Sequence, residues 1–336
     1  MTRFAVLGAG SWGSTFALLL ARAGHEVTLW ARREELAREI REEHRCRDYL
    51  GERELPAAIT ATSRIAEAVE GASALVIAVP AQRLRESLAA WRAAPGMGGS
   101  LPPVPVVSLA KGIERGTDRR MSEVLVDAGG IAPGLVTVLS GPNLAAEIAE
   151  GQPCGSVVAG TDPDVVQAVA RWCQGPSLRA YTSADLVGVE VAGAVKNIVA
   201  IAVGAAAGLG YGDNTRASLI TRGLAEMSRL GTALGGDPAT FAGLAGMGDL
   251  VATCASPLSR NHSLGAALGR GLDIEQAAAA VGRTAEGVET ARAVDVIARR
   301  LGVDMPITRS VVAVADRGAR IEDVTAALLA RPVRPE

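Results

Sequence analysis

A glycine-rich turn near the start of the chain constrains its fold more than any other feature. The apolar run Arg3–Leu7 leads into Gly8-Ala9-Gly10-Ser11-Trp12-Gly13, and a helical pattern follows over Trp12–Ala23. In a G-x-G-x-x-G turn the first glycine permits the tight turn, the second lets a pyrophosphate approach the backbone, and the third lets the helix pack on the strand. The unpaired N–H groups of the helix then face the phosphates. We therefore expect Gly8, Gly10 and Gly13 to bind a dinucleotide.

Strand and helix patterns alternate from residue 3 to about residue 186. The apolar runs lack polar alternation, which predicts a parallel sheet covered on both faces. The predicted strands are Arg3–Leu7, Val27–Trp30, Leu75–Val79, Val104–Ser108, Thr137–Leu139, Ser156–Ala159 and Leu178–Tyr181. The helices predicted between them include Trp12–Ala23, Arg83–Ala93 and Pro163–Cys173. This order predicts an α/β fold with an N-terminal, doubly wound Rossmann-type domain over residues 1–186.

Beyond residue 186 helical periodicity dominates, and we expect an all-helical, substrate-binding domain over residues 187–331. The predicted helices are Val187–Ala207, Asn214–Leu234, Ser263–Gly269, Ile274–Val281, Gly287–Leu301 and Ile307–Ala315. The apolar stretch Val191–Gly212 contains Lys196 and Asn197. Its uninterrupted apolar part is roughly 15 residues, fewer than the ~20 that a bilayer requires, so a buried helix is predicted instead of a membrane span.

Composition excludes several classes of partner. The formal net charge is −2 and aromatic residues make up 3% of the chain, so the basic field and stacking surface that nucleic acid binding requires are missing. Four scattered cysteines and only three histidines predict that no metal is bound and that the protein is cytoplasmic. The first residues run straight into a strand, without a secretory pattern. The apolar second domain suggests a homodimer.

The end of the second strand indicates which dinucleotide is bound. An NAD-selective site carries Asp or Glu there to bind the ribose 2′-hydroxyl, but this strand ends in Ala31-Arg32-Arg33. Two guanidinium groups suit a 2′-phosphate, which favours NADP(H), with NAD(H) as a second cofactor. Glu34 and Glu35 follow directly. The alternative is that Arg32 and Arg33 are ordinary surface residues at the start of a helix.

Lysine is almost absent from the chain. Lys and Arg total 34, but only Lys111 and Lys196 are lysines. A position that keeps lysine suggests a role that arginine cannot fill, because a desolvated ammonium can release its proton and a guanidinium cannot. Lys196 lies in the apolar segment VEVAGAVKNIVAIAV, and Lys111 follows the strand VPVVSLA at the carboxyl end of the sheet. We interpret both as catalytic. The alternative is that these two lysines remain by chance in a chain that otherwise uses arginine.

Three other functions are alternatives to a lysine-dependent dehydrogenase of the kind described. A 2-hydroxy-acid dehydrogenase of the lactate type needs a histidine base in its second half, where only His262 is present. A 3-hydroxy-acid dehydrogenase also joins a Rossmann domain to a helical domain with a catalytic lysine, and a substrate panel would distinguish it. A non-catalytic dinucleotide sensor is the third possibility, but a sensor has no need of a titrating base.

Over nearly its whole length the chain resembles the bacterial NAD(P)-dependent glycerol-3-phosphate dehydrogenases. The motifs that carry the resemblance are GAGSWG (8–13), AVPAQ (78–82), SLAKGIE (108–114), SGPNLAAEIA (140–149), VAGAVKNIVAIA (191–202), GYGDNTRASLITRGLAEMSRLG (210–231), GLAGMGDLVATCASPLSRNHSLG (243–265) and AEGVET (285–290). The resemblance implies interconversion of sn-glycerol 3-phosphate and dihydroxyacetone phosphate, which supplies glycerol 3-phosphate for phospholipid synthesis.

The resemblance also implies a role for individual residues. Lys196 would be the proton acceptor, and Lys111 would contact both substrate and cofactor. The further substrate positions are Gly141, Asn143, Asp249, Thr253, Ser259, Arg260 and Asn261. The further cofactor positions are Ser11, Trp12, Arg32, Arg33, Tyr49, Ala145, Arg260, Thr284 and Glu286. The chain departs from the family at Asn143, where Ser or Thr is usual, and at Thr284, where valine is common.

The segment Ser259-Arg260-Asn261 also makes chemical sense without the resemblance. A guanidinium fork, two polar side chains and backbone N–H groups at the start of a helix suit a phosphate dianion. The alternative is that Ser259 or Asn261 simply caps the helix. Asp249, which follows Gly246-Met247-Gly248, is expected to orient Lys196.

Overall fold

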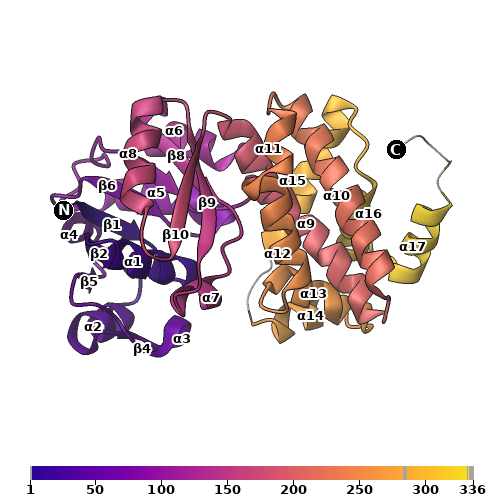
Figure 1. Cartoon of the computed structure of the whole chain (residues 1–336), viewed down its shortest axis with the longest axis horizontal. Coiled ribbons are helices and arrows are strands. Elements are labelled where there is room, and N and C mark those ends of the chain that lie inside the picture. Colours follow the sequence, from indigo (N-terminus) through magenta and orange to yellow (C-terminus); the bar gives the residue numbers. More distant parts are fainter. Residues whose placement is uncertain (1, 283–285, 331, 333–336) are drawn as a thin grey trace. The chain divides into compact units, whose positions relative to one another are not determined.

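The computed structural model describes residues 2–282, 286–330 and 332 (Figure 1). The chain divides into two compact units. The first consists of Met1–Lys111 with Arg119–Glu190, and the second of Gly112–Asp118 with Val191–Glu336. This division falls four residues after the predicted boundary at residue 186 and assigns a short segment after Lys111 to the second unit. The predicted functions of the two domains stay predictions.

An eight-stranded sheet forms the centre of the first unit, with strand order β10-β9-β8-β7-β6-β1-β2-β5. Its strands are β1 (Arg3–Leu7), β2 (Glu26–Trp30), β5 (Ile59–Thr62), β6 (Ala74–Ile77), β7 (Val106–Ser108), β8 (Val136–Ser140), β9 (Cys154–Gly160) and β10 (Leu178–Ser183). A separate ribbon pairs β3 (Arg45–Cys46) with β4 (Gly51–Glu54). The strand order reverses between β1 and β6, which is where doubly wound folds bind their ligands.

The predicted α/β class is confirmed, and each of the seven predicted strands is present, β1 with the predicted bounds and the other six with shifted ends. Two features of the sheet differ from the prediction. The edge strand β5 was not predicted, because its four residues, ITAT, are too short and too polar to resemble a buried run. The predicted parallel pairing holds for the other strand pairs of the sheet, but β8 and β9 are antiparallel. The five-residue helix α7 between them packs on α1 instead of crossing the sheet.

Helices cover both faces of this sheet. Alternate residues of β1 point to opposite faces, as the pleat requires, so Phe4 and Val6 join one core cluster and Ala5 and Leu7 the other. The helices of the first unit are α1 (Ser11–Arg22), α2 (Glu34–Glu43), α3 (Arg47–Leu50), α4 (Ile65–Val69), α5 (Leu84–Ala93), α6 (Met121–Gly129), α7 (Ala145–Ala149) and α8 (Pro163–Cys173). Residues of α1, α2 and α8 pack on one face, and residues of α4, α5 and α6 on the other.

Helices make up most of the described part of the second unit. Its helices are α9 (Leu186–Gly208), which begins in the first unit, α10 (Asp213–Ala233), α11 (Pro238–Ala242), α12 (Asp249–Ala255), α13 (Arg260–Gly269), α14 (Ile274–Ala280), α15 (Glu286–Leu301), α16 (Pro306–Arg317) and α17 (Ile321–Leu329). Among the described residues, α9 alone is long and apolar enough to cross a membrane by length and composition, and 83% of its most apolar window is buried. The burial of α9 matches that of a core helix.

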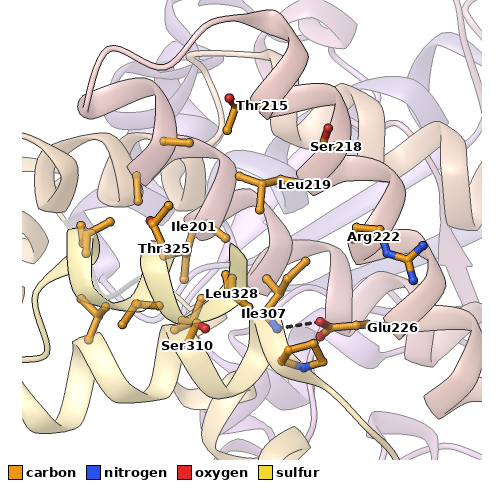
Figure 2. Close-up of a pocket in the computed structure, with 18 of the residues that line it drawn as sticks. Ile201, Thr215, Ser218, Leu219, Arg222, Glu226, Ile307, Ser310, Thr325 and Leu328 are labelled. Atoms are coloured by element: carbon orange, nitrogen blue, oxygen red, sulfur yellow. Dashed lines mark hydrogen bonds between the residues drawn. The ribbon is translucent and has the colours of Figure 1, made fainter. Parts of the chain in front are cut away.

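A cavity of about 750 Å³ lies in the second unit, between α9, α10, α16 and α17 (Figure 2). Its lining is mostly apolar, and none of the predicted site residues lines it. The carboxylate of Glu226 reaches it from α10 and accepts hydrogen bonds from the backbone N–H groups of Ile307 (2.6 Å) and Thr308 (3.2 Å). These groups open helix α16, so Glu226 caps that helix from another element. Burial raises the pKa of Glu226 from 4.5 to about 7.

The raised pKa makes the stability of the second unit depend on pH. The folded state holds the Glu226 proton more tightly than the unfolded state, so this contribution is present below about pH 4.5 and is lost as pH rises to about 7. The loss is about 3 kcal/mol by linkage. In Glu226→Gln this decline should be absent, although the amide loses an acceptor for one N–H group. The measurement is the free energy of unfolding across that range, with the exposed Glu275→Gln as control. An unchanged decline in Glu226→Gln would contradict the assignment.

Candidate active site

The glycine-rich turn joins β1 to α1, and its first and third glycines are sterically required. Gly8 has φ +130°, and a Cβ on it would lie 2.5 Å from the carbonyl oxygen of Ala78. A Cβ on Gly13 would collide with the carbonyl oxygen of Gly8. At Gly10, by contrast, a Cβ would meet nothing within 4 Å among the described residues. The backbone is therefore open at Gly10, next to the N–H groups that begin α1, and a pyrophosphate fits there.

Buried polar atoms without partners mark the same region. Within the described part of the chain, the indole Nε1 of Trp12 and the hydroxyl of Ser140 are buried and have no hydrogen-bond partner. Buried polar groups are nearly always paired, so such atoms indicate that a ligand completes them. The carbonyl oxygen of Ala145, at the start of α7, accepts a hydrogen bond from Thr15 on α1 (3.4 Å). The predicted cofactor position Ala145 thus lies against the helix of the glycine turn.

The two arginines after β2 differ in their surroundings. Both are exposed, and Arg33 forms an ion pair with Asp48. The hydrogen bond to Asp48 raises the pKa of Arg33 above its usual value. Arg32 has no ion pair among the described residues. Tyr49, the predicted cofactor position next to Asp48, lies half-buried in α3 and packs against the core. Arg32 is therefore the guanidinium available to an additional phosphate.

Lys111 lies where two neighbouring strands end. It follows β7, and its Nζ donates a hydrogen bond to the carbonyl oxygen of Gly141 (3.1 Å), which follows β8. Because β7 and β8 are parallel, their carboxyl ends meet at one edge of the sheet. The glycine turn after β1 lies at the same edge. The structure thus brings Lys111, Gly141 and the glycine turn to the edge where such sheets bind ligands.

Lys196 is buried in the second unit together with two polar partners. Lys196 lies on α9, and the residue is 7% exposed. Its Nζ lies 2.5 Å from Asp249 Oδ1 and 2.9 Å from Thr253 Oγ1. Thr253 in turn donates a hydrogen bond to Asp249 Oδ1 (3.2 Å). Asp249 is 1% exposed, so the ion pair is removed from water. The expectation that Asp249 orients Lys196 agrees with this geometry.

Helix α12 places both partners of Lys196, and the sequence patterns did not predict this helix. Asp249 and Thr253 are one turn apart on α12 and therefore face the same way. A π-helical turn, Leu244–Gly248, precedes α12. A Cβ on Gly246 in this turn would collide with the carbonyl oxygen of Phe241. The glycines that make this close turn possible also interrupt the apolar periodicity from which a helix is predicted.

The crossing of α9 and α13 brings the segment Ser259–Asn261 near Lys196. Any Cβ on Gly204 of α9 would collide with the carbonyl oxygen of His262, and one on Gly265 of α13 with that of Ile201. The two helix backbones are thus in contact. At the site of Gly287, a Cβ would lie 2.7 Å from Asn261 Oδ1 and 2.9 Å from the carbonyl oxygen of Asn197, which is the neighbour of Lys196. The start of α13 therefore lies near the backbone of Asn197, the next residue after Lys196 on α9.

Two members of this segment also have a structural role. Ser259 caps α13 by accepting a hydrogen bond from the backbone N–H of His262 (3.3 Å). Asn261 Oδ1 accepts one from the backbone N–H of Gly287 (3.1 Å), near the start of α15. Arg260 is exposed and forms no ion pair among the described residues. The guanidinium of Arg260 is thus available for a phosphate. The capping alternative holds for Ser259, whereas Asn261 binds the start of another helix, α15.

The structure groups the predicted residues into two sets, one in each unit. The set of the first unit comprises Gly8, Gly10, Ser11, Trp12, Gly13, Arg32, Arg33, Tyr49, Lys111, Gly141, Asn143 and Ala145. The set of the second unit comprises Lys196, Asp249, Thr253, Ser259, Arg260, Asn261 and Glu286. Thr284 lies outside the described residues. Over residues 2–282, 286–330 and 332, no group of three or more His, Cys, Asp or Glu side chains is arranged to hold a metal ion.

A Rossmann-type unit with an open phosphate turn, followed by a helical unit with a buried lysine, defines a two-domain, dinucleotide-dependent dehydrogenase. The family model described as NAD-dependent glycerol-3-phosphate dehydrogenase N-terminus matches residues 3–166, and the corresponding C-terminus model matches residues 185–326. The chain belongs to the NAD-dependent glycerol-3-phosphate dehydrogenase family.

Full-length relatives agree with this assignment. The chain is 50% identical over 337 residues to a glycerol-3-phosphate dehydrogenase [NAD(P)+] of Corynebacterium glutamicum, covering 100% of both chains. It is also 50% identical to that of Thermobifida fusca, covering 100% of this chain and 99% of the relative. Among solved structures, the glycerol-3-phosphate dehydrogenase of Coxiella burnetii matches with a TM-score of 0.91 and 35% identity, over 98% of this chain and 99% of that one.

Proposed function

We propose that the chain interconverts sn-glycerol 3-phosphate and dihydroxyacetone phosphate with an NAD(P) cofactor. The observation that carries this proposal is the buried Lys196–Asp249–Thr253 cluster in a member of this family. The enzyme would supply glycerol 3-phosphate for glycerophospholipid synthesis, the usual role of the family.

Proton transfer is the role of Lys196. The dinucleotide, held at the glycine turn after β1, would supply the hydride that the reduction requires. In that direction the Lys196 ammonium donates a proton to the substrate oxygen that becomes a hydroxyl. In the oxidative direction the neutral amine takes that proton back. Asp249 and Thr253 both accept hydrogen bonds from Lys196 Nζ and so fix the direction of this group. Lys111 places a second positive charge next to Gly141 and stabilises negative charge on the substrate.

Phosphate recognition is assigned to the start of α13. The helix has ten residues, and its first N–H groups together with the Arg260 guanidinium suit a phosphate dianion. The cap provided by Ser259 and the bond from Gly287 to Asn261 keep this terminus rigid. A rigid terminus loses little entropy on binding, which favours affinity.

NADP(H) is proposed as the preferred cofactor, with NAD(H) also accepted. Arg32 supports this proposal, because it is exposed at the end of β2 without an ion pair in the described structure. Arg33 contributes less, since Asp48 already neutralises it. A cytoplasmic location is supported by the four cysteines, all of which are free thiols.

A homodimer is the proposed assembly. Large apolar side chains are exposed on the second unit, and exposed apolar surface is typical of an interface. These exposed residues are Tyr211, Met247, Val251, Leu258, Val296 and Leu301.

Replacing Lys196 tests the proposed chemistry. Lys196→Arg keeps a cation beside Asp249 but cannot release a proton, and Lys196→Met removes the cation. Both variants should lose at least about 100-fold in kcat, the usual contribution of a general acid or base. NADPH binding, followed by nicotinamide fluorescence, should stay within about twofold, because the glycine turn lies in the other unit. A Lys196→Arg enzyme that turns over at the wild-type rate would refute the role of Lys196.

Replacing Arg32 tests the cofactor preference. Arg32→Ala should raise the KM for NADPH about tenfold and change the KM for NADH less than about twofold, since only NADPH carries a 2′-phosphate. The exposed Arg171→Ala on α8 is the matched control and should change neither value. An equal rise for both cofactors would place Arg32 on the part of the dinucleotide that they share, contrary to the proposal.

A further inference from the structure

Asn143 stands at a position where the family usually has Ser or Thr, and a second polar residue holds it. Asn143 lies in the loop between β8 and α7. Ser156, fully buried on the adjacent strand β9, donates its hydroxyl to Asn143 Oδ1 over 2.7 Å. Neither the apolar pattern of β9 nor the resemblance to the family indicated a role for Ser156.

The hydrogen bond from Ser156 determines which end of the amide remains for a ligand. With Oδ1 engaged, the Nδ2 group of Asn143 is buried and has no hydrogen-bond partner among the described residues. The nearby Ser140 hydroxyl is unpaired in the same way. Two buried, unpaired polar groups three residues apart are costly to the folded state unless a ligand completes them.

The loop that carries Asn143 is fixed from two sides. Gly141 has φ +151°, and a Cβ on it would lie 2.9 Å from the carbonyl oxygen of Gly155 and 3.0 Å from Ser156 Cα, so the loop lies directly on β9. From the other side, Lys111 Nζ donates to the carbonyl oxygen of Gly141 (3.1 Å). The unpaired Nδ2 group therefore belongs to a rigid loop at the ligand-binding edge of the sheet, next to a predicted catalytic lysine.

We propose that Ser156 is a positioning residue, which holds Asn143 so that Nδ2 donates a hydrogen bond to an acceptor oxygen of the bound ligands. This role rests on the proposed function. The acceptor is an oxygen of the phosphorylated substrate or of the cofactor's carboxamide. A hydroxyl at position 143 donates in any rotamer, whereas an amide has a broad, two-fold terminal torsion and must be held to present its nitrogen. The asparagine thus depends on a hydroxyl at position 156.

A double-mutant cycle tests this dependence, with Ser156→Ala made in the wild type and in Asn143→Ala. Wild-type turnover of dihydroxyacetone phosphate is measured first. In the wild type, Ser156→Ala should lower kcat/KM about tenfold, and in Asn143→Ala the same change should cost less than about twofold, because no amide is left to hold. A rise in the KM for dihydroxyacetone phosphate places the acceptor on the substrate, and a rise in the KM for NADPH places it on the cofactor.

Controls separate positioning from folding. Ser156→Cys keeps the side-chain size and a weak donor, so its loss should be smaller than that of Ser156→Ala and should be measurable even if the alanine variant unfolds. Ser177→Ala removes another buried hydroxyl of the same unit and should leave kcat/KM unchanged. Equal losses in both backgrounds, or no loss in the wild type, would overturn the role of Ser156 alone. No wild-type turnover would refute the proposed function, and this role with it.

Discussion

The buried ion pair between Lys196 and Asp249 is the constraint that the candidate site in the second unit has to satisfy. Removing an ammonium and a carboxylate from water costs several kcal/mol for each ion, and close contact offsets that cost only with good geometry and further hydrogen bonds. Thr253 supplies such a bond, because it contacts both charged groups. A pair of this kind adds little stability over apolar side chains of the same size. We infer that it is kept for its chemistry.

The packing around the pair follows from this requirement. Asp249 follows a π-helical turn, in which Gly246 packs directly on the backbone of Phe241. Gly204 and Gly265 let the backbones of α9 and α13 come into direct contact. Small residues thus allow these helix axes to approach one another closely. In the first unit the glycines shape a turn. Gly8 and Gly13 allow close backbone contacts there, and Gly10 leaves the backbone accessible to a ligand.

The fold class could be predicted from the sequence because it has a local signal, and the candidate residues of the site were also chosen on local signals. The glycine spacing lies within six residues, and the rarity of lysine singles out Lys111 and Lys196 without any structure. Features that depend on contacts distant in sequence were missed. Helix α12 is hidden by its glycines, and the antiparallel pairing of β9 depends on where α7 packs. The bond from Ser156 to Asn143 and the ion pair of Arg33 with Asp48 join residues on different elements, so no local pattern reports them.

The central claim is that this chain reduces dihydroxyacetone phosphate by a lysine-dependent proton transfer. The most direct measurement is the oxidation of reduced nicotinamide, followed by its absorbance, with dihydroxyacetone phosphate and with a panel of 2-keto and 3-keto acids. The account predicts rapid turnover confined to dihydroxyacetone phosphate, faster with NADPH than with NADH at limiting cofactor. Turnover of a 3-keto acid, or tight NADPH binding with no turnover of any substrate, would contradict it.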